Sequence, residues 1–124
     1  MRVLIADDSV VVRERLISLL SDLHGIEVIG QAEDASEARS LAVKLKPDVA
    51  ILDLRMPKGS GADVLFYLKK LKPAPKVIML TNYPNVENKR KCIDGGADYF
   101  LDKSNEFHVV VSVLKGMLPG PAKA

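Results

Sequence analysis

Residues 49–53 have the sequence VAILD, in which four consecutive apolar residues are followed directly by an acid. An unbroken apolar run of this length that contains β-branched residues is typical of a strand buried on both faces of a sheet. Strands of that kind occur mainly in parallel sheets covered by helices on both sides. The acid, Asp53, would then lie at the carboxyl end of its strand, which is where open α/β sheets bind their ligands.

Outward from this run, strand-like and helix-like apolar periods alternate along the whole chain. The predicted strands are residues 3–6, 26–32, 49–52, 77–80 and 99–101. The predicted helices are about residues 9–23, 34–46, 60–71, 86–93 and 105–118, with a Pro/Gly loop at residues 56–61. Five β–α units in succession predict an α/β fold with a doubly wound, five-stranded parallel sheet and helices on both faces.

Local signals support these boundaries. Asp34 and Glu37 have the spacing of a capping box at the start of the second helix, and Pro47 ends that helix. The apolar spacing leaves two inward-facing positions open, Leu19 or Leu20 in the first helix and Val110 or Val111 in the last.

The bulk composition indicates one folded domain. The chain has 124 residues, of which 48% are hydrophobic and 27% charged, and these values are ordinary for a globular domain. We expect the domain to span residues 1–118, and residues 119–124, which begin Pro119-Gly120-Pro121, to form a flexible C-terminal tail. The single cysteine, Cys92, excludes an internal disulfide and is expected to be a small buried hydrophobe.

Charge and hydropathy argue against several kinds of partner. The net charge is only +2 and the Lys and Arg residues are scattered, so the one short cluster, Lys89-Arg90-Lys91, is expected to be a solvated helix face rather than a nucleic-acid contact. His24 and His108 are far apart and are expected at the surface or at helix ends. No apolar run approaches the roughly 18 residues of a membrane span, and the run at residues 3–6 is too short for a secretion signal. The sequence predicts a cytoplasmic protein that contacts neither nucleic acid nor membrane through this domain.

Side chains that can act on phosphate or on a cation follow four of the five predicted strands. They are Asp7 and Asp8 after the first strand, Asp53 after the third, Thr81 after the fourth and Lys103 just beyond the fifth. Taken singly, each has an ordinary explanation: Asp8 or Ser9 could cap the first helix, Asp53 and Thr81 could simply end strands, and Lys103 could be solvated. Those explanations account neither for the convergence of four strand ends on one edge nor for a second carboxylate beside Asp8.

A phosphoryl site explains the whole set. Three converging carboxylates repel one another, and Mg²⁺, which takes oxygen ligands, relieves that repulsion. An aspartate such as Asp53 can accept a phosphoryl group as an acyl phosphate, and phosphoryl transfer depends mainly on positioning and charge neutralisation. The Lys103 ammonium would add positive charge, and the Thr81 hydroxyl could donate to a phosphoryl oxygen.

This set of motifs resembles the receiver domain of response regulators in two-component signalling. The resemblance spans nearly the whole chain, from Val3 to about Leu118. The matching pieces are Asp7-Asp8, residues 51–57 (ILDLRMP) with Gly61, Leu80-Thr81, and residues 95–103 (GGADYFLDK). The resemblance implies a flavodoxin-like fold of the chemotaxis-regulator type, with strand order 2-1-3-4-5.

The resemblance also implies roles for the acids. Asp53 would be the phosphoacceptor and would take its phosphoryl group from a sensor histidine kinase or a phosphotransfer protein. Asp8, Asp53 and the backbone carbonyl of Arg55 would bind Mg²⁺, with Asp7 assisting through water. The domain would not be a turnover enzyme, and would at most phosphorylate and dephosphorylate itself.

Further roles concern the output of the signal. Thr81 and Lys103 would bind the phosphoryl group, and Phe100 occupies the position of the family's aromatic switch residue. The fourth helix, fifth strand and fifth helix would then form the face that meets a downstream protein target.

Three positions depart from the family pattern. Ser104 follows Lys103 where the family usually has a proline with a cis peptide bond; a cis bond before a non-proline residue costs roughly 2.5–4 kcal/mol, which favours trans, but the sequence leaves the isomer open. Asn82 stands where the family usually has a small residue, which would narrow phosphoryl access. The switch position holds Phe100, without a hydroxyl, next to Tyr99.

Several functional classes compete with or refine this interpretation. The module could stand alone or be the receiver part of a longer DNA-binding regulator. A haloacid-dehalogenase-like phosphatase also uses an Asp nucleophile and Mg²⁺, but its second Asp lies two residues after the nucleophile, a spacing the adjacent Asp7 and Asp8 do not match. A receiver-like binding module that is never phosphorylated usually lacks one of the key positions, all of which are present here. A dinucleotide site is disfavoured because no Gly-x-Gly-x-x-Gly follows a strand.

Overall fold

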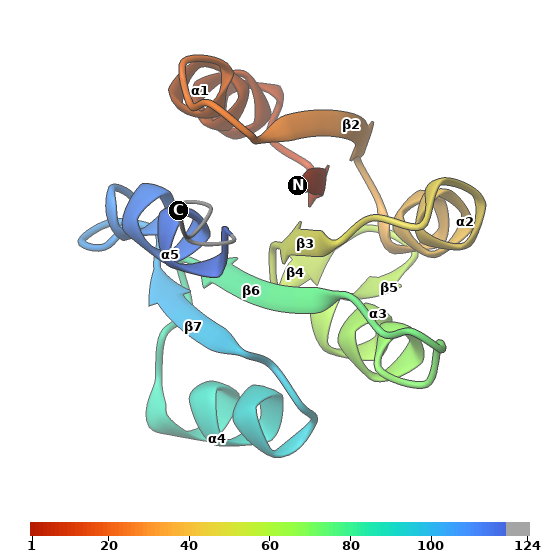
Figure 1. Cartoon of the computed structure of the whole chain (residues 1–124). Helices are drawn as coiled ribbons and strands as arrows, with labels where there is room; N and C mark the ends of the chain where they lie inside the picture. Colours follow the sequence, from red (N-terminus) through yellow and green to blue (C-terminus); the bar gives the residue numbers. More distant parts are fainter. Residues whose placement is uncertain (119–124) are drawn as a thin grey trace.

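A computed structural model describes residues 1–118 of the chain, and it forms a single five-stranded parallel sheet with helices on both faces (Figure 1). The sheet has the order β2-β1-β3-β6-β7. Its strands are β1 (Arg2–Ala6), β2 (Glu27–Ala32), β3 (Val49–Leu52), β6 (Lys76–Thr81) and β7 (Tyr99–Asp102). The helices are α1 (Val10–Ser21), α2 (Ala35–Leu45), α3 (Gly61–Leu68), α4 (Val86–Asp94) and α5 (Val109–Met117). The predicted fold class and strand order are confirmed, since β6 and β7 are the fourth and fifth strands of the sheet.

The core is divided by the sheet into two layers. On one side α1 and α5 cover Val3, Ile5, Val49 and Ile51, and on the other side α2, α3 and α4 cover the alternate residues of the same strands (Figure 1). Because successive side chains of a strand point to opposite faces, a strand covered on both sides must be apolar throughout. This requirement explains why all four residues of β3 are buried.

The register of the strands places their carboxyl ends on one edge. Ala6 pairs with Leu52, and Leu52 pairs with Met79, so Asp7 and Asp53 lie side by side while β6 continues two residues further, to Thr81. Two backbone hydrogen bonds extend this alignment past the strand ends: Asp53 N–H donates to Ala6 O at 2.9 Å, and Lys103 N–H donates to Thr81 O at 2.8 Å. The polar residues of four strands are thereby brought to a common edge.

Helix starts follow the predicted capping chemistry. The Asp34 side chain accepts from Glu37 N–H, whereas the Glu37 side chain accepts from Glu33 N–H rather than from the capping residue. The α1 N-cap is Ser9, not Asp8. The two open positions are settled by burial, since Leu20 and Val110 are buried whereas Leu19 is 37% exposed and Val111 is only partly buried.

Three sequence predictions differ from the structure. The third helix, predicted over residues 60–71, ends at Leu68. The last helix begins at Val109 rather than near Asn105, because Asp102 holds the preceding segment in turns by accepting from Ser104 N–H and from the Asn105 side chain. The predicted loop at residues 56–61 contains a short antiparallel pair, β4 (Arg55–Met56) with β5 (Gly59–Ser60). Strands of two residues have too little periodicity to be predicted from the pattern of apolar residues.

Other details concern the ends and the loops. The Lys103–Ser104 bond, whose isomer the sequence left open, is trans, since within residues 1–118 the only cis peptide bond is Lys72–Pro73. His24 and His108 are exposed and Cys92 is fully buried, as predicted. None of the helices in the described part of the chain combines the length and the apolarity that crossing a membrane requires. The predicted tail at residues 119–124 lies outside the described residues.

Candidate functional site

Asp53 occupies the centre of the carboxyl edge of the sheet. It follows β3, the middle strand, and is only 5% exposed. The loop after it returns so closely that a Cβ at Gly61 would overlap the Asp53 carbonyl oxygen, and Gly61 N–H donates to Leu54 O at 2.7 Å. Glycine at position 61 is therefore required by this close backbone approach.

Three carboxylates converge at this edge. Asp7, Asp8 and Asp53 each offer one oxygen within 4.8 Å of the others. Asp7 is 2% exposed, whereas Asp8 faces solvent. The three acids predicted from strand-end positions are thus gathered in one cluster.

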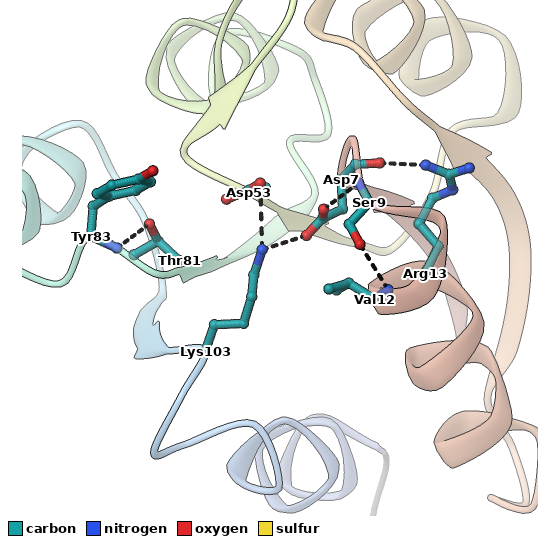
Figure 2. A network of polar contacts seen from close by, with 8 residues as sticks. All are labelled: Asp7, Ser9, Val12, Arg13, Asp53, Thr81, Tyr83 and Lys103. Carbon is teal, nitrogen blue, oxygen red and sulfur yellow. Dashed lines mark hydrogen bonds and ion pairs between the residues drawn. The ribbon is translucent and has the colours of Figure 1, made fainter.

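Lys103 links two of these acids from the far side of the cluster. It comes from the loop after β7, and its Nζ lies 2.7 Å from Asp7 Oδ2 and 3.4 Å from Asp53 Oδ2 (Figure 2). Its side chain is only 9% exposed. A lysine buried between two carboxylates neutralises part of their charge, and its ammonium is placed where it can also meet an anion attached to Asp53.

Burial shifts the acidity of Asp53. The pKa of Asp53 is raised from 3.8 to about 6, mainly by loss of hydration and next by the charge of Asp7, while Lys103 opposes both effects. Among the described residues, Asp53 Oδ1 is the only buried side-chain oxygen or nitrogen without a hydrogen-bond partner. An unpartnered carboxylate oxygen amid three acids fits a hard divalent cation, which would supply the missing positive charge and ligand.

Asp7 is held by contacts that the sequence did not reveal. Its Oδ1 accepts from Ser9 N–H at 2.8 Å, and its carbonyl oxygen accepts from the Arg13 guanidinium at 2.6 Å (Figure 2). Because Asp7 Oδ2 is bonded to Lys103 as well, both carboxylate oxygens of Asp7 already have partners. The sequence indicates Ser9 only as a helix cap, and an arginine one turn into a helix carries no distinguishing sequence signal.

Thr81 is fully buried at the end of β6, and its hydroxyl oxygen accepts from Tyr83 N–H at 2.9 Å (Figure 2). The Tyr83 ring stacks against the Arg55 guanidinium, 3.9 Å from the ring centroid. The loop after β3 and the loop after β6 are therefore in contact. Neither Tyr83 nor the side chain of Arg55 was predicted to take part, because their meeting depends on how two separate loops fold.

The aromatic position on the neighbouring strand is partly buried. Phe100 pairs in register with Met79 and packs against the layer formed by α2, α3 and α4. Tyr99, on the opposite face of β7, is 42% exposed, and Asn82 is exposed. Phe100 thus lies between the sheet and the helices, where a change of rotamer would alter the surface.

Comparison with known proteins identifies the family. The family model of the response regulator receiver domain matches residues 3–115. The chain therefore belongs to the response regulator receiver domains, the receiver modules of two-component systems, and the predicted resemblance is confirmed.

One curated relative is considerably longer than this chain. The transcriptional regulatory protein LiaR of Bacillus subtilis is 34% identical over 122 residues, which cover 98% of this chain and 58% of LiaR. The chain spans a little over half the length of the curated relatives at the head of the comparison. What these longer proteins do as a whole is a property of more than this domain.

Solved structures agree with the fold. The signal receiver domain of NarL from Mycobacterium tuberculosis has a TM-score of 0.84 and 31% identity, and the match covers 93% of this chain and 94% of that one. A CheY chain in a CheX–CheY complex with BeF3 and Mg²⁺ from Borrelia burgdorferi has a TM-score of 0.85 and 26% identity, with 96% and 90% covered.

Proposed function

We propose that Asp53 is the phosphoacceptor of this receiver domain and that it takes its phosphoryl group from a sensor histidine kinase or a phosphotransfer protein. A carboxylate oxygen of Asp53 would form the bond to phosphorus, and the bond from phosphorus to the donor's leaving atom would break, with the electron pair leaving on the donor. The observation that carries the proposal is the burial of Asp53 with one unpartnered oxygen and with Lys103 Nζ 3.4 Å from the other.

The neighbouring residues divide the remaining work. Asp8, Asp53 and the Arg55 carbonyl would hold Mg²⁺, and when bound the ion would neutralise charge on the transferring group. Asp7 would act indirectly, because both of its carboxylate oxygens are bonded to Ser9 N–H and Lys103. This division retains the ligand assignment expected from the family and gives a structural reason for it.

An exposed apolar surface beside the acids suits a phosphodonor protein. Val10 and Val11, in the first turn of α1, are 53% and 69% exposed. They follow the Asp7–Ser9 segment directly, so a donor domain that packs on them would bring its phosphorylated side chain to Asp53. The CheX–CheY complex supports protein partners for relatives of this chain.

The output would run through Thr81 and Phe100. A phosphoryl group on Asp53 adds about −1.5 to −2 charge and three acceptor oxygens. Those acceptors would draw the Thr81 hydroxyl away from Tyr83 N–H and shift the loop before α4, so that Phe100 can turn inward. We propose that the α4–β7–α5 face then meets a downstream partner, either another protein or another part of a longer regulator.

The domain would work in the cytoplasm as residues 1–118, without turnover of an external substrate beyond its own phosphorylation and dephosphorylation. Turnover of a generic phosphate ester such as p-nitrophenyl phosphate, lost on replacing Asp53, would instead support the phosphatase alternative.

Intact-mass measurement after incubation with acetyl phosphate and Mg²⁺ tests the acceptor assignment. One phosphoryl mass is expected on the wild type and none on Asp53→Asn. Asp94→Asn, a change of the same kind on the exposed end of α4, should be labelled like the wild type. Full labelling of Asp53→Asn would overturn the assignment.

Hydrogen exchange tests the output route. Phosphorylation, or a beryllofluoride mimic, is expected to change exchange most between residues 83 and 107 and least in α2. Thr81→Ala should still accept phosphate but lose much of this change. If the maps of phosphorylated Thr81→Ala and wild type coincide across that range, the hydroxyl does not couple the site to the output face.

A further inference from the structure

The amino edge of the sheet, which lies opposite the carboxyl edge with Asp53, carries a concentration of positive charge. Residues 38–47, in and after α2, and residues 64–76, in and after α3, contain seven of the chain's 18 Lys and Arg residues and no Asp or Glu. The chain as a whole has a net charge of only +2. The two segments lie side by side because α2 packs on α3 (Figure 1), and four of the seven cations, Arg39, Lys46, Lys72 and Lys76, line the hollows between them.

An apolar cavity opens in the middle of this basic surface. It has a volume of about 410 Å³ and lies between the end of α2 and the loop from α3 to β6. Its walls include Val43, Leu71 and Pro73, and Lys46, Lys72 and Lys76 stand around it. All three lysines are exposed. A volume of this size is within the usual range of ligand pockets.

The cavity continues along α2. A second hollow, lined by Arg39, Val43 and Tyr67 among others, shares Val43 with the first. Val43 and Tyr67 are 47% and 41% exposed and give this hollow an apolar surface. Together the two hollows form a groove, named here the α2–α3 groove, that follows the eleven residues of α2. That helix is roughly 16 Å long, which is the reach of about five extended residues.

The walls of the groove are held in place. Lys69 Nζ donates to Pro75 O at 2.8 Å and pairs with Asp98 at 2.7 Å, which fixes the loop between α3 and β6. The one acid on the wall, Asp48, accepts from Arg2 N–H at 2.8 Å. Lys76 has only a loose contact with Asp98, at 3.9 Å. The groove is therefore largely preformed, and most of its rim charge is free to meet a ligand.

We propose that the α2–α3 groove binds a short acidic segment of a partner protein, whose large apolar side chain fills the cavity while flanking carboxylates meet Lys46, Lys72 and Lys76. The charge of the rim selects an anionic ligand, and the apolar walls select one with an apolar group to bury. Nucleic acid has phosphates but would leave the apolar walls without a suitable partner. A flat bilayer would not enter a concave cavity. This surface is distinct from the α4–β7–α5 face and lies at the edge of the sheet opposite Asp53.

Binding can be tested on the unphosphorylated protein, so failure here would be separate from failure of the phosphoacceptor proposal. The probe is a fluorescein-labelled twelve-residue peptide of Asp and Glu with a central Leu-Phe pair. Fluorescence polarisation gives the affinity, and amide shifts of the ¹⁵N-labelled protein locate the contact. We expect the shifts to gather in residues 39–47 and 67–76.

Charge reversal provides the matched control. The double variant Lys46→Glu with Lys72→Glu should bind the peptide at least about tenfold more weakly. Two contacts between a lysine and a peptide carboxylate become contacts between like charges. Lys89→Glu with Lys91→Glu makes the same change of net charge on exposed residues of α4 and should change the affinity less than about twofold. Equal losses in the two double variants would overturn the proposal, because binding would then depend on net charge alone.

The apolar part of the proposal has its own control. A peptide with Ser-Ser in place of Leu-Phe should bind at least about tenfold more weakly, because it buries no large side chain. Equal binding of this peptide would overturn the role of the cavity. Shifts in the groove caused by a thymidine dodecanucleotide or by phosphatidylserine vesicles, without any from the peptide, would overturn the choice of an acidic protein segment.

Discussion

The two edges of the sheet differ in charge and in burial. The carboxyl edge holds mainly buried acids, and the amino edge holds exposed lysines. At the carboxyl edge Asp7 and Asp53 are almost completely buried and share the buried ammonium of Lys103. At the amino edge Lys46 and Lys72 are exposed around an apolar cavity. A buried charge strongly changes the pKa of its neighbour. An exposed charge is screened by salt, so several exposed charges are needed for a comparable effect. The difference indicates chemistry at the first edge and recognition at the second.

The largest expected effect concerns the cost of the buried charge at Asp53. Because the folded pKa is raised to about 6, stability from this group is fully present below about pH 4 and is lost as the pH rises through 6. Asp53→Asn should therefore stabilise the fold at pH 7.5 by about 2 kcal/mol, once partial screening by solvent is counted, and by much less at pH 4. Urea unfolding at the two pH values measures both differences.

Mg²⁺ and a remote variant control this result. Mg²⁺ should reduce the difference in unfolding free energy between Asp53→Asn and the wild type at pH 7.5. It should stabilise only the wild type, because it binds the acid cluster of the folded protein. Asp94→Asn should leave the stability nearly unchanged at both pH values. If the wild type is as stable as Asp53→Asn at both pH values, burial of the Asp53 carboxylate does not destabilise the fold.

The two charged neighbours of Asp53 should shift its pKa in opposite directions. Lys103 lowers the pKa of Asp53 and Asp7 raises it, so Lys103→Met should move the pKa of Asp53 above 6 and Asp7→Asn should move it below 6. Titration of the ¹³C-labelled carboxyl carbons by NMR gives both values. Shifts in the same direction would contradict the described arrangement of charges.

A smaller effect is expected on metal affinity. Asp8→Ala should weaken Mg²⁺ binding several-fold more than Asp7→Ala does. Asp8 is exposed and available as a ligand, whereas both carboxylate oxygens of Asp7 already accept hydrogen bonds. Isothermal titration of the unphosphorylated variants compares them, with Asp94→Asn as the control. Equal or reversed losses would assign the direct ligand to Asp7 instead.

The smallest effect is expected from the amino edge. Lys46→Glu with Lys72→Glu should change the free energy of unfolding by less than about 0.5 kcal/mol. The same pair should leave the pKa of Asp53 unchanged, because a six-residue strand such as β6 separates the edges by roughly 17 Å, about twice the screening length at physiological salt. A measurable shift of that pKa would mean that the two edges communicate through the fold.

The sequence alone was sufficient for the fold class, because periodicity is a local property. The apolar run at residues 49–52 indicated a strand covered on both faces, and the alternation around it predicted the layers. Chain order and strand ends then placed Asp7, Asp8, Asp53 and Lys103 on one edge, and the structure does bring these four together. The short β4–β5 pair and the start of α5 were not predictable, because they depend on hydrogen bonds of individual side chains rather than on a repeating pattern.

Only the tertiary structure decided how the charges are shared and where they gather. That Asp7 is bonded on both oxygens, and that Asp53 keeps one oxygen free, follows from the packing of Ser9 and Lys103 around them. The lysines of the amino edge looked scattered because they belong to two segments separated by residues 48–63, and they meet only when α2 packs on α3. Residue types and spacing determine which groups a chain possesses, but burial and the approach of distant segments determine how strongly each group acts.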